Sequence, residues 1–309
     1  MRDMWRKFIS LTILTLFICS NMGLAFANAV PEKTVLDKVV AVEKFFYGAE
    51  MTGALVDRVS TLEKDIYGKE SKDPLLTKAD NLYSSTYENF IDQPSFLIKL
   101  NAIQWSLTHS VTVEPAKPRI ENLERVLTGN LVTGSLNDRL TKLLKLAYTN
   151  GQVTTSNVTL HKDSLLKIKL VTPLSTNTNR KGDSFLFQAA DDIYVDGHLV
   201  IPKGSQGQGV VNKVKGAKNF GRNAELEVSF NTVEAIDGTV IHTVLGDKAK
   251  EENKSLVTAA GASLAGIAIL GPIGIVGGAF VHGKEITIPA GVEMYVQFKD
   301  ETNAYGIQE

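Results

Sequence analysis

The sequence predicts an α+β protein, in which an N-terminal helical-hairpin repeat domain precedes a C-terminal antiparallel β-barrel or sandwich with an inserted apolar helical hairpin. Three observations predict it. Apolar residues follow a helical period and an internal repeat in the first half, and they alternate with polar residues in the second half. An uncharged Gly/Ala-rich run at 255–283 interrupts the alternation. We therefore expect domains at 30–150 and 165–309, joined by a linker at 151–164.

The segment 1–29 is typical of a secretory signal peptide. Basic residues precede an apolar core at 8–26, and an A-x-A cleavage signal stands at 27–29. An uncleaved membrane anchor is the main alternative interpretation, and lipidation at Cys19 is a minor one, because the bulky Ile18 precedes that cysteine. Cys19, the only cysteine of the chain, lies inside this segment, so the mature protein has neither disulfides nor a thiol nucleophile. We expect an exported protein, located in the periplasm or associated with the outer membrane of a bacterial envelope.

Charge and composition narrow the class of partner. The formal net charge is −1, and 22% of the residues are charged. This balance excludes a strongly basic surface that coats nucleic acid, and it excludes an acidic disordered tail. We expect no nucleic-acid partner. The 43% of hydrophobic residues suffices for ordinary folded cores.

An internal repeat defines the helical domain, with copies at about 42–68 and 123–148. Their first parts, VEKFFYGAEMTGALVDRV at 42–59 and LERVLTGNLVTGSLNDRL at 123–140, align without gaps. Gly48 and Gly129 fall where a helix would end in a left-handed cap. A stripe of apolar residues at i, i+4, i+7 and i+11 predicts a second helix in each copy. Each copy is thus predicted to be an αα-hairpin that packs on the other copy or on the segment between them.

Recurrent charges in the two copies predict structural ion pairs. Glu43 and Arg58 of the first copy match Glu124 and Arg139 of the second. We expect each Glu–Arg pair to fix its own hairpin, and the alternative is an arginine that binds a ligand. A catalytic pair of carboxylates is less favoured, because no histidine or nucleophile accompanies these residues.

The repeat resembles short helical repeats of secreted bacterial envelope proteins, which have the form L-E-x-x-x-x-G…G-x-L-x-x-R-L-x-x-L-E-x-x-x-(F/Y)-G. Residues 62–68, LEKDIYG, fit its closing half, whereas Leu144 and Thr149 depart from it in the second copy. The resemblance implies an envelope location and brings no defined ligand. Between the copies, residues 75–87 and the region of 96–105 are expected to be helical.

Alternation predicts half-buried antiparallel strands from Leu165 onward. It is clear at 165–170, 225–230 and 293–298, where apolar residues alternate with charged or polar ones. Turn signals recur at short spacing, at Lys181-Gly182, Asp196-Gly197, Lys203-Gly204, Asp237-Gly238 and Ala290-Gly291. Many short strands with such turns predict a small barrel or sandwich.

Part of the β domain carries a second resemblance. Residues 197–205 read GHLVIPKGS, GQGVV follows at 207–211, and IPAGV at 288–292 closes the domain. This order of elements resembles the C-terminal barrel of the TrbI-like family, an outer-membrane core component of type IV secretion and conjugation machines. The resemblance implies a barrel whose insertion between late strands forms a helical hairpin through the outer membrane. The chain departs from the family in lacking its cytoplasmic anchor and its long proline-rich stalk.

Gly271-Pro272 divides the uncharged run at 255–283, since proline removes a helix hydrogen bond. Neither half comfortably spans a bilayer core of about 30 Å, and a hairpin would return the chain to the side of the flanking strands. Three interpretations stay open: membrane insertion, helix packing between copies, and a buried hydrophobic loop. The residues assigned to a membrane or oligomer hairpin are Gly261, Ala265, Gly271, Pro272, Gly274 and Gly278.

The sequence contains no motif for catalysis or for binding of a metal or cofactor. The five histidines are dispersed, and there is no G-x-S-x-G, Walker A or dinucleotide fingerprint. We therefore predict no cofactor, no metal and no enzymatic activity. The sequence predicts a structural or transport-assembly component of the cell envelope, partnered by copies of itself, other envelope proteins or the lipid bilayer. The alternative is a module that binds peptidoglycan or another wall polymer.

Overall fold

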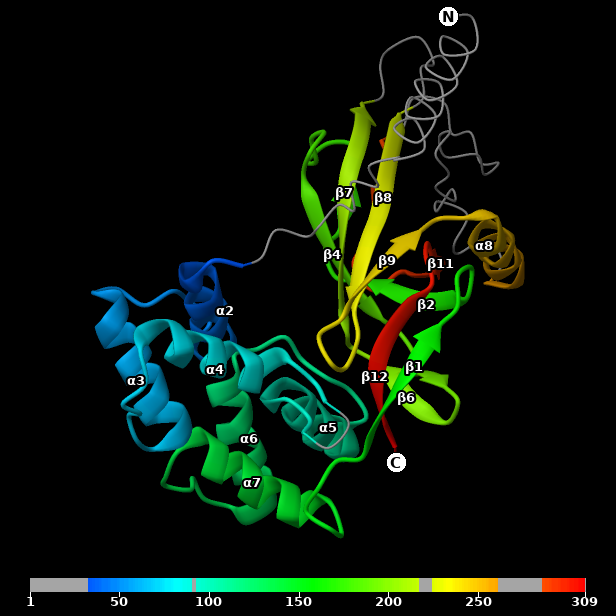
Figure 1. The fold of residues 1–309 in the computed structure, drawn as a ribbon. Helices are drawn as coiled ribbons and strands as arrows, with labels where there is room; N and C mark the ends of the chain where they lie inside the picture. The colour runs from blue at the N-terminus through cyan, green and yellow to red at the C-terminus, as the bar shows by residue number, and fades with distance from the viewer. Residues whose placement is uncertain (1–32, 91–92, 217–223, 261–284, 309) are drawn as a thin grey trace, which may run out of the picture. The chain divides into compact units, whose positions relative to one another are not determined.

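Between Val35 and Ala147, six helices of similar length follow one another (Figure 1). The structure, a computed structural model, describes residues 33–90, 93–216, 224–260 and 285–308, so the predicted signal peptide lies outside it. The helices are α2 (Val35–Tyr47), α3 (Leu55–Tyr67), α4 (Leu75–Tyr87), α5 (Phe96–Thr108), α6 (Ala116–Thr128) and α7 (Leu136–Ala147). Their starting positions are evenly spaced, except that the step from α4 to α5 is longer by a single position.

This even spacing explains the internal repeat. The predicted copies coincide with α2–α3 and α6–α7, which lie four helices apart in the array. Gly48 and Gly129 adopt the left-handed conformation expected after a helix, with φ of 84° and 75°. The repeating unit is therefore a single helix with its following turn, and α4 and α5 belong to the same array.

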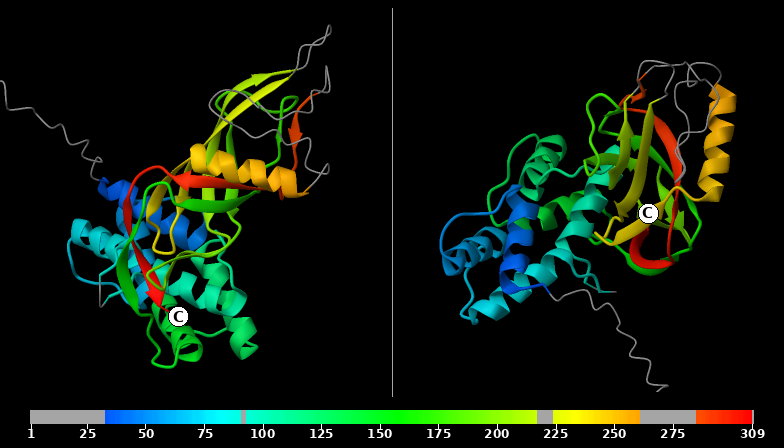
Figure 2. Two further views of the ribbon diagram at one scale, coloured as in Figure 1. Left: turned by 90° about the vertical axis from the view of Figure 1, so that its right-hand side faces the viewer. Right: turned by 90° about the horizontal axis from the view of Figure 1, so that it is seen from above.

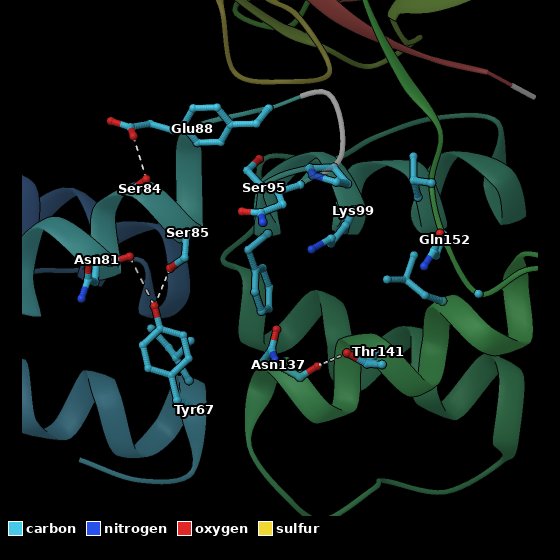
Figure 3. A pocket seen from close by; sticks show the side chains of 18 of the residues that line it. Tyr67, Asn81, Ser84, Ser85, Glu88, Ser95, Lys99, Asn137, Thr141 and Gln152 are labelled. Atoms are coloured by element: carbon cyan, nitrogen blue, oxygen red, sulfur yellow. Dashed lines mark hydrogen bonds between the residues drawn. The ribbon is translucent and has the colours of Figure 1, made fainter. Parts of the chain in front are cut away.

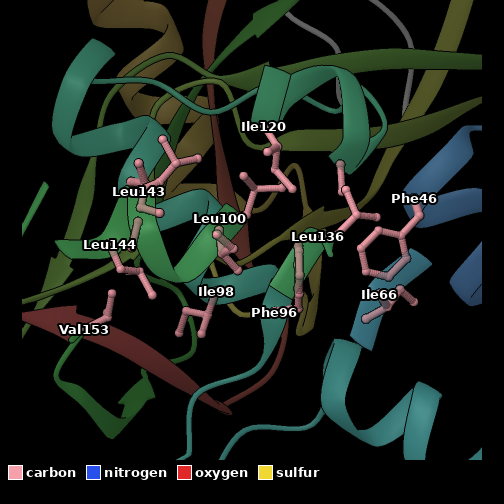
Figure 4. Close-up of a cluster of buried hydrophobic side chains, with 14 of the residues drawn as sticks. Phe46, Ile66, Phe96, Ile98, Leu100, Ile120, Leu136, Leu143, Leu144 and Val153 are labelled. Carbon is pink, nitrogen blue, oxygen red and sulfur yellow. The ribbon is translucent and has the colours of Figure 1, made fainter. Parts of the chain in front are cut away.

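One hydrophobic core runs through the helical array and into the β half (Figure 4). All six helices contribute buried apolar side chains, including Phe46, Ile66, Ile98, Leu100, Ile120 and Leu143. Three residues of the β half, Leu199, Ile236 and Ile307, belong to the same cluster. Residues Val35–Glu309 form one compact unit, so the two halves share a core.

Six antiparallel strands of the second half close into a barrel, in the order β11-β2-β4-β7-β8-β9 (Figure 1). They are β2 (Leu165–Leu170), β4 (Ser184–Ala189), β7 (Gln206–Lys215), β8 (Glu225–Glu234), β9 (Val240–Val244) and β11 (Glu293–Phe298). A second sheet has the order β1-β12-β6-β5, and β10 pairs with β3. These strands are β1 (Thr155–Leu160), β3 (Leu174–Ser175), β5 (Ile193–Val195), β6 (His198–Ile201), β10 (Thr287–Ile288) and β12 (Thr302–Gln308). The predicted α+β class is confirmed, and a closed barrel is present.

Phenylalanine rings fill the barrel. Phe185 and Phe187 on β4 each contact Phe230 on β8 edge-to-face, with ring centroids 5.4 Å apart. Gly207 and Gly209 on β7 leave room for these rings, because a Cβ at Gly207 would lie 2.1 Å from the Phe187 ring and one at Gly209 would lie 2.2 Å from the Phe185 ring. Inside the barrel, the two glycines of the GQG segment therefore lie opposite the two phenylalanine rings of β4.

The five predicted turns all form, each with a glycine at φ between 78° and 95°: Gly182, Gly197, Gly204, Gly238 and Gly291. The expected linker at 151–164 differs from the prediction. Strand β1 lies within it and pairs with β12 from Thr155↔Ile307 to Leu160↔Thr302. The chain therefore passes from the helical array directly into a sheet.

The turn around Lys203 is a contact between the two halves. The Val111 amide donates to the Lys203 carbonyl at 2.9 Å. The Asp192 carboxylate accepts from the Lys203 amide at 2.6 Å and from the Trp105 indole at 3.1 Å. Gly204 has a φ of 89°, and a Cβ there would lie 2.4 Å from the Val111 carbonyl oxygen. The segment that resembles TrbI-like barrels is thus also where the helical array docks.

We expect Gly204→Ala to loosen this docking contact. The matched control is Gly197→Ala, because Gly197 also has a left-handed φ of 78° but no atom within 4 Å of its Cβ position. Both variants carry the cost of a left-handed alanine, and Gly204→Ala must also displace the Val111 backbone. It should therefore lose about 1 to 3 kcal/mol more unfolding free energy than the control. Urea unfolding measures the difference, and equal losses would rule out the close approach.

Candidate functional site

Two buried Glu–Arg pairs join successive helices of the array. Arg58 Nε and Nη2 donate to the two carboxylate oxygens of Glu43 at 2.7 and 2.6 Å. Arg139 contacts Glu124 in the same way, with both bonds at 2.7 Å. Both glutamates are 0% exposed. The structure thus brings together both predicted pairs, in the bidentate geometry that arginine forms with a carboxylate.

Each glutamate also holds the turn that follows its own helix. Glu43 Oε2 accepts from the Met51 amide at 3.1 Å, and Glu124 Oε2 accepts from the Val132 amide at 3.2 Å. Burial alone would raise the pKa of Glu124, but the hydrogen bonds from Arg139 and from the Val132 amide outweigh burial and lower it. The hydrogen bond with Glu124 raises the pKa of Arg139 in turn.

The paired positions recur along the array. A lysine or arginine stands fourth in every helix: Lys38, Arg58, Lys78, Lys99, Arg119 and Arg139. At four of the five junctions, the ninth residue of the preceding helix supplies its acceptor. Besides the two Glu–Arg pairs, Lys78 contacts Glu63 at 3.1 Å, and Arg119 Nε donates to Gln104 at 2.9 Å.

The junction of α4 and α5 lacks this acceptor. Tyr83 stands ninth in α4, and the connection to α5 is longer by a single position than at the other junctions. Within the described residues, the Lys99 ammonium has neither a hydrogen bond nor an ion pair. Burial lowers the pKa of the Lys99 amine accordingly.

Lys99 points into a polar groove of about 840 Å³ (Figure 3). Helices α3, α4, α5 and α7 line the groove together with the segment at 151–154. Its polar side chains include those of Asn81, Ser85, Ser95, Asn137, Thr141 and Gln152. The Ser95 hydroxyl accepts from the Ile98 amide and so caps the start of α5, which places Lys99 in the first turn of that helix.

Among the described residues that line the groove, the acidic one, Glu88, is directed away from Lys99. The Glu88 carboxylate accepts from the Ser84 hydroxyl at 2.7 Å and points away from Lys99 (Figure 3). The Tyr67 hydroxyl is bound to Ser85 and to the Asn81 carbonyl. Besides Glu88 and Lys99, the polar side chains that the structure describes along the groove are neutral amides and hydroxyls, an arrangement that can hold an anionic group.

Reasoning from the sequence missed Lys99 and the groove. The signal was present, because the fourth-position cation recurs once per helix along the whole array. A comparison of single helices would have placed Lys99 opposite Tyr83, at a position where the first helix of each other junction has a glutamate or glutamine. Alignment of the two longer copies does not reveal this position, because α4 and α5 share few identities with those copies.

Helix α8 (Asp247–Ala260) begins ahead of the apolar run that was expected from Ser255. The predicted hairpin residues Gly261, Ala265, Gly271, Pro272, Gly274 and Gly278 lie outside the described ranges, so the hairpin stays a prediction. Across the part of the chain that the structure describes, no helix combines the length and the apolar character that a membrane crossing requires.

One asparagine fixes α8 on the barrel. Asn253, 3% exposed, donates to the Tyr295 carbonyl at 2.9 Å and accepts from the Tyr295 amide at 2.7 Å. On this side of β11, β9 pairs only with Gln297 and Phe298. Asn253 therefore satisfies backbone groups that no strand reaches. Figure 2 shows α8 lying along β11.

We expect Asn253→Ala to release α8 from β11. The change leaves the Tyr295 amide and carbonyl without their partner, which should cost about 1 to 3 kcal/mol. Hydrogen exchange reports the release of α8, because the Tyr295 amide should then exchange faster. Glu252→Ala, an exposed neighbour on the same helix, is the control and should leave that exchange rate unchanged. Unaltered protection in Asn253→Ala would show that other contacts hold the helix.

Within residues 33–90, 93–216, 224–260 and 285–308, no group of three or more His, Cys, Asp or Glu side chains could hold a metal ion. No protein-family model and no curated protein matches the chain. Among solved structures, the chain is similar to ComB10 of the Com type IV secretion system of Helicobacter pylori, at 14% sequence identity and a TM-score of 0.25. The match covers 46% of this chain and 88% of that chain. A TM-score of this size does not establish a shared fold.

Proposed function

We propose that the protein is an exported, non-enzymatic component of a structural or transport assembly in the cell envelope. The position of α8 carries the proposal. This helix is docked on strand β11 of the closed barrel, and its sequence continues into an uncharged run that extends to Gly283. A barrel whose docked helix leads into such a run could contact a bilayer or further copies of itself.

Two features of the sequence support the envelope location. The predicted signal peptide would export the chain, and the GHLVIPKGS segment resembles the TrbI-like barrels of envelope-spanning machines. The helical array is fixed to that same segment by the Val111–Lys203 hydrogen bond. We propose that the barrel and the array act as one rigid body, with the apolar run as the attachment to a membrane or to neighbouring copies.

Cell fractionation tests this proposal. The full chain is compared with a version in which 261–281 is replaced by a short Gly/Ser turn, which leaves α8 in place. We expect the full chain to sediment with outer membranes or as an oligomer, and the replaced version to be soluble and monomeric. Identical behaviour of the two proteins would overturn the proposal.

A module that binds a wall polymer is the second candidate, and the polar groove is the observation that favours it. We propose that the groove would take short exposed segments of such a polymer, because it is open and lined by amides and hydroxyls. Co-sedimentation of the mature chain with purified peptidoglycan tests this function. Recovery of the protein in the supernatant at all protein concentrations would eliminate it.

A further inference from the structure

We propose that the groove of the helical array is a binding site for the carboxylate end of a short peptide, with the Lys99 ammonium as its charged contact. The inference rests on the geometry of the array and does not require the membrane attachment proposed above. If the peptide belongs to a wall polymer, this inference rests on the second candidate function and identifies its ligand.

The array itself shows what Lys99 lacks. The other fourth-position cations each contact an oxygen: Lys38 meets Asp80 at 2.8 Å, Lys78 meets Glu63 at 3.1 Å, and the arginines have the partners described above. Lys99 occupies the same position in α5 and faces open space instead of an acceptor. A ligand carboxylate at its Nζ would complete the contact that a glutamate makes elsewhere.

An unpaired lysine is unfavourable at this position. Lys99 is half-buried, and it lies in the first turn of α5, where the helix dipole is positive. Burial of a charge without a partner also carries a cost. Nothing in the packing of α5 requires a cation there, since the groove is open at this point. We therefore infer that Lys99 serves to bind a ligand and does not serve to stabilise the fold.

The rest of the groove fits a peptide better than a compact anion such as phosphate. Asn137 and Gln152 offer both hydrogen-bond donors and acceptors, as peptide groups require. Phe90, 55% exposed, adds an apolar surface at the lip. The volume lies within the range of about 300–1,000 Å³ that small-ligand sites occupy. The Glu88 carboxylate points away from Lys99, so it does not compete with a ligand carboxylate for the Lys99 ammonium (Figure 3).

Calorimetric titration of the mature chain tests the site. The probes are N-acetyl-trialanine with a free carboxylate and the same peptide as its C-terminal amide. We expect the acid to bind and the amide to bind at least tenfold more weakly. In Lys99→Gln, affinity for the acid should fall roughly 10- to 100-fold, the range expected for a charged hydrogen bond. Lys117→Gln, an exposed lysine of α6 outside the groove, should bind as the parent does.

A stability measurement separates binding from folding. Without ligand, Lys99→Met should keep or raise the thermal midpoint, whereas Lys78→Met should lower it because Glu63 loses its buried partner. Equal binding of acid and amide, no binding of either, or unchanged affinity in Lys99→Gln would each overturn the proposal. The acid made of D-alanine then separates the sources. Tighter binding of the D-peptide assigns wall peptides, and tighter binding of the L-peptide assigns the C-terminus of a protein.

Discussion

Arg139→Met is expected to lower the free energy of unfolding by about 3 to 5 kcal/mol, because it leaves a buried carboxylate without its ion partner. Glu124 is 0% exposed and would retain only the hydrogen bond from the Val132 amide among the contacts described above. Guanidinium unfolding of the mature chain measures the loss. The double variant with Glu124→Met should recover much of it, since two apolar side chains of similar volume replace the pair.

The effect should depend on pH in a defined direction. The folded-state pKa of Glu124 is lowered, so its stabilising contribution is present above the unfolded pKa of about 4.3 and is lost as pH falls through the folded pKa. In Arg139→Met, burial without the arginine raises the pKa of the Glu124 carboxyl, so the deficit should shrink as pH falls through that raised pKa. Lys64→Met is the control: Lys64 is 59% exposed in its contact with Glu70, and the loss should stay below about 1 kcal/mol. Similar losses in both variants would refute a buried structural pair.

Phe230→Ala should lower the unfolding free energy by about 3 to 5 kcal/mol, the range for removal of a large ring from a closed core. The Phe230 side chain is 1% exposed and contacts both Phe185 and Phe187. The glycines of β7 opposite these rings have no side chains that could fill the cavity. Thermal unfolding followed by near-ultraviolet circular dichroism would report the loss of barrel stability.

Val240→Ala on the adjacent strand β9 is the matched control for the barrel. Val240 is 53% exposed, so its truncation should change stability by no more than about 0.5 kcal/mol. If Phe230→Ala were equally mild, the barrel interior could not be as closely packed as the ring contacts indicate.

The barrel was largely predictable from the sequence, because apolar and polar residues alternate clearly in strands such as β2 and in most of β8. Leu166, Ile168 and Leu170, for example, are at most 1% exposed, as their alternation with lysine predicts. The Glu–Arg pairs could also be predicted. Opposite charges recur at the same positions of two amphipathic hairpins, and pairing within each hairpin is the arrangement that this recurrence favours. In both cases the information lies within one short segment.

Other features depend on contacts between distant segments and leave little signal. Strand β1 has the composition of a turn-rich linker, TSNVTL, and becomes a strand through its pairing with β12. The hydrogen bond from Val111 to Lys203 uses backbone atoms, which every residue possesses. For Lys99, the recurring cation marks the position in the sequence, but the groove that it faces depends on the fold of the whole array.

The attachment of α8 also determines how the barrel would respond to mechanical tension. A pull on the chain beyond Ala260 would reach β11 through α8, and the two Asn253 hydrogen bonds would break before the longer pairing of β11 with β2. The barrel would remain closed, but the Tyr295 amide and carbonyl would lose the side chain that binds them. Withdrawal of α8 would therefore expose two backbone groups of β11 to new hydrogen-bond partners.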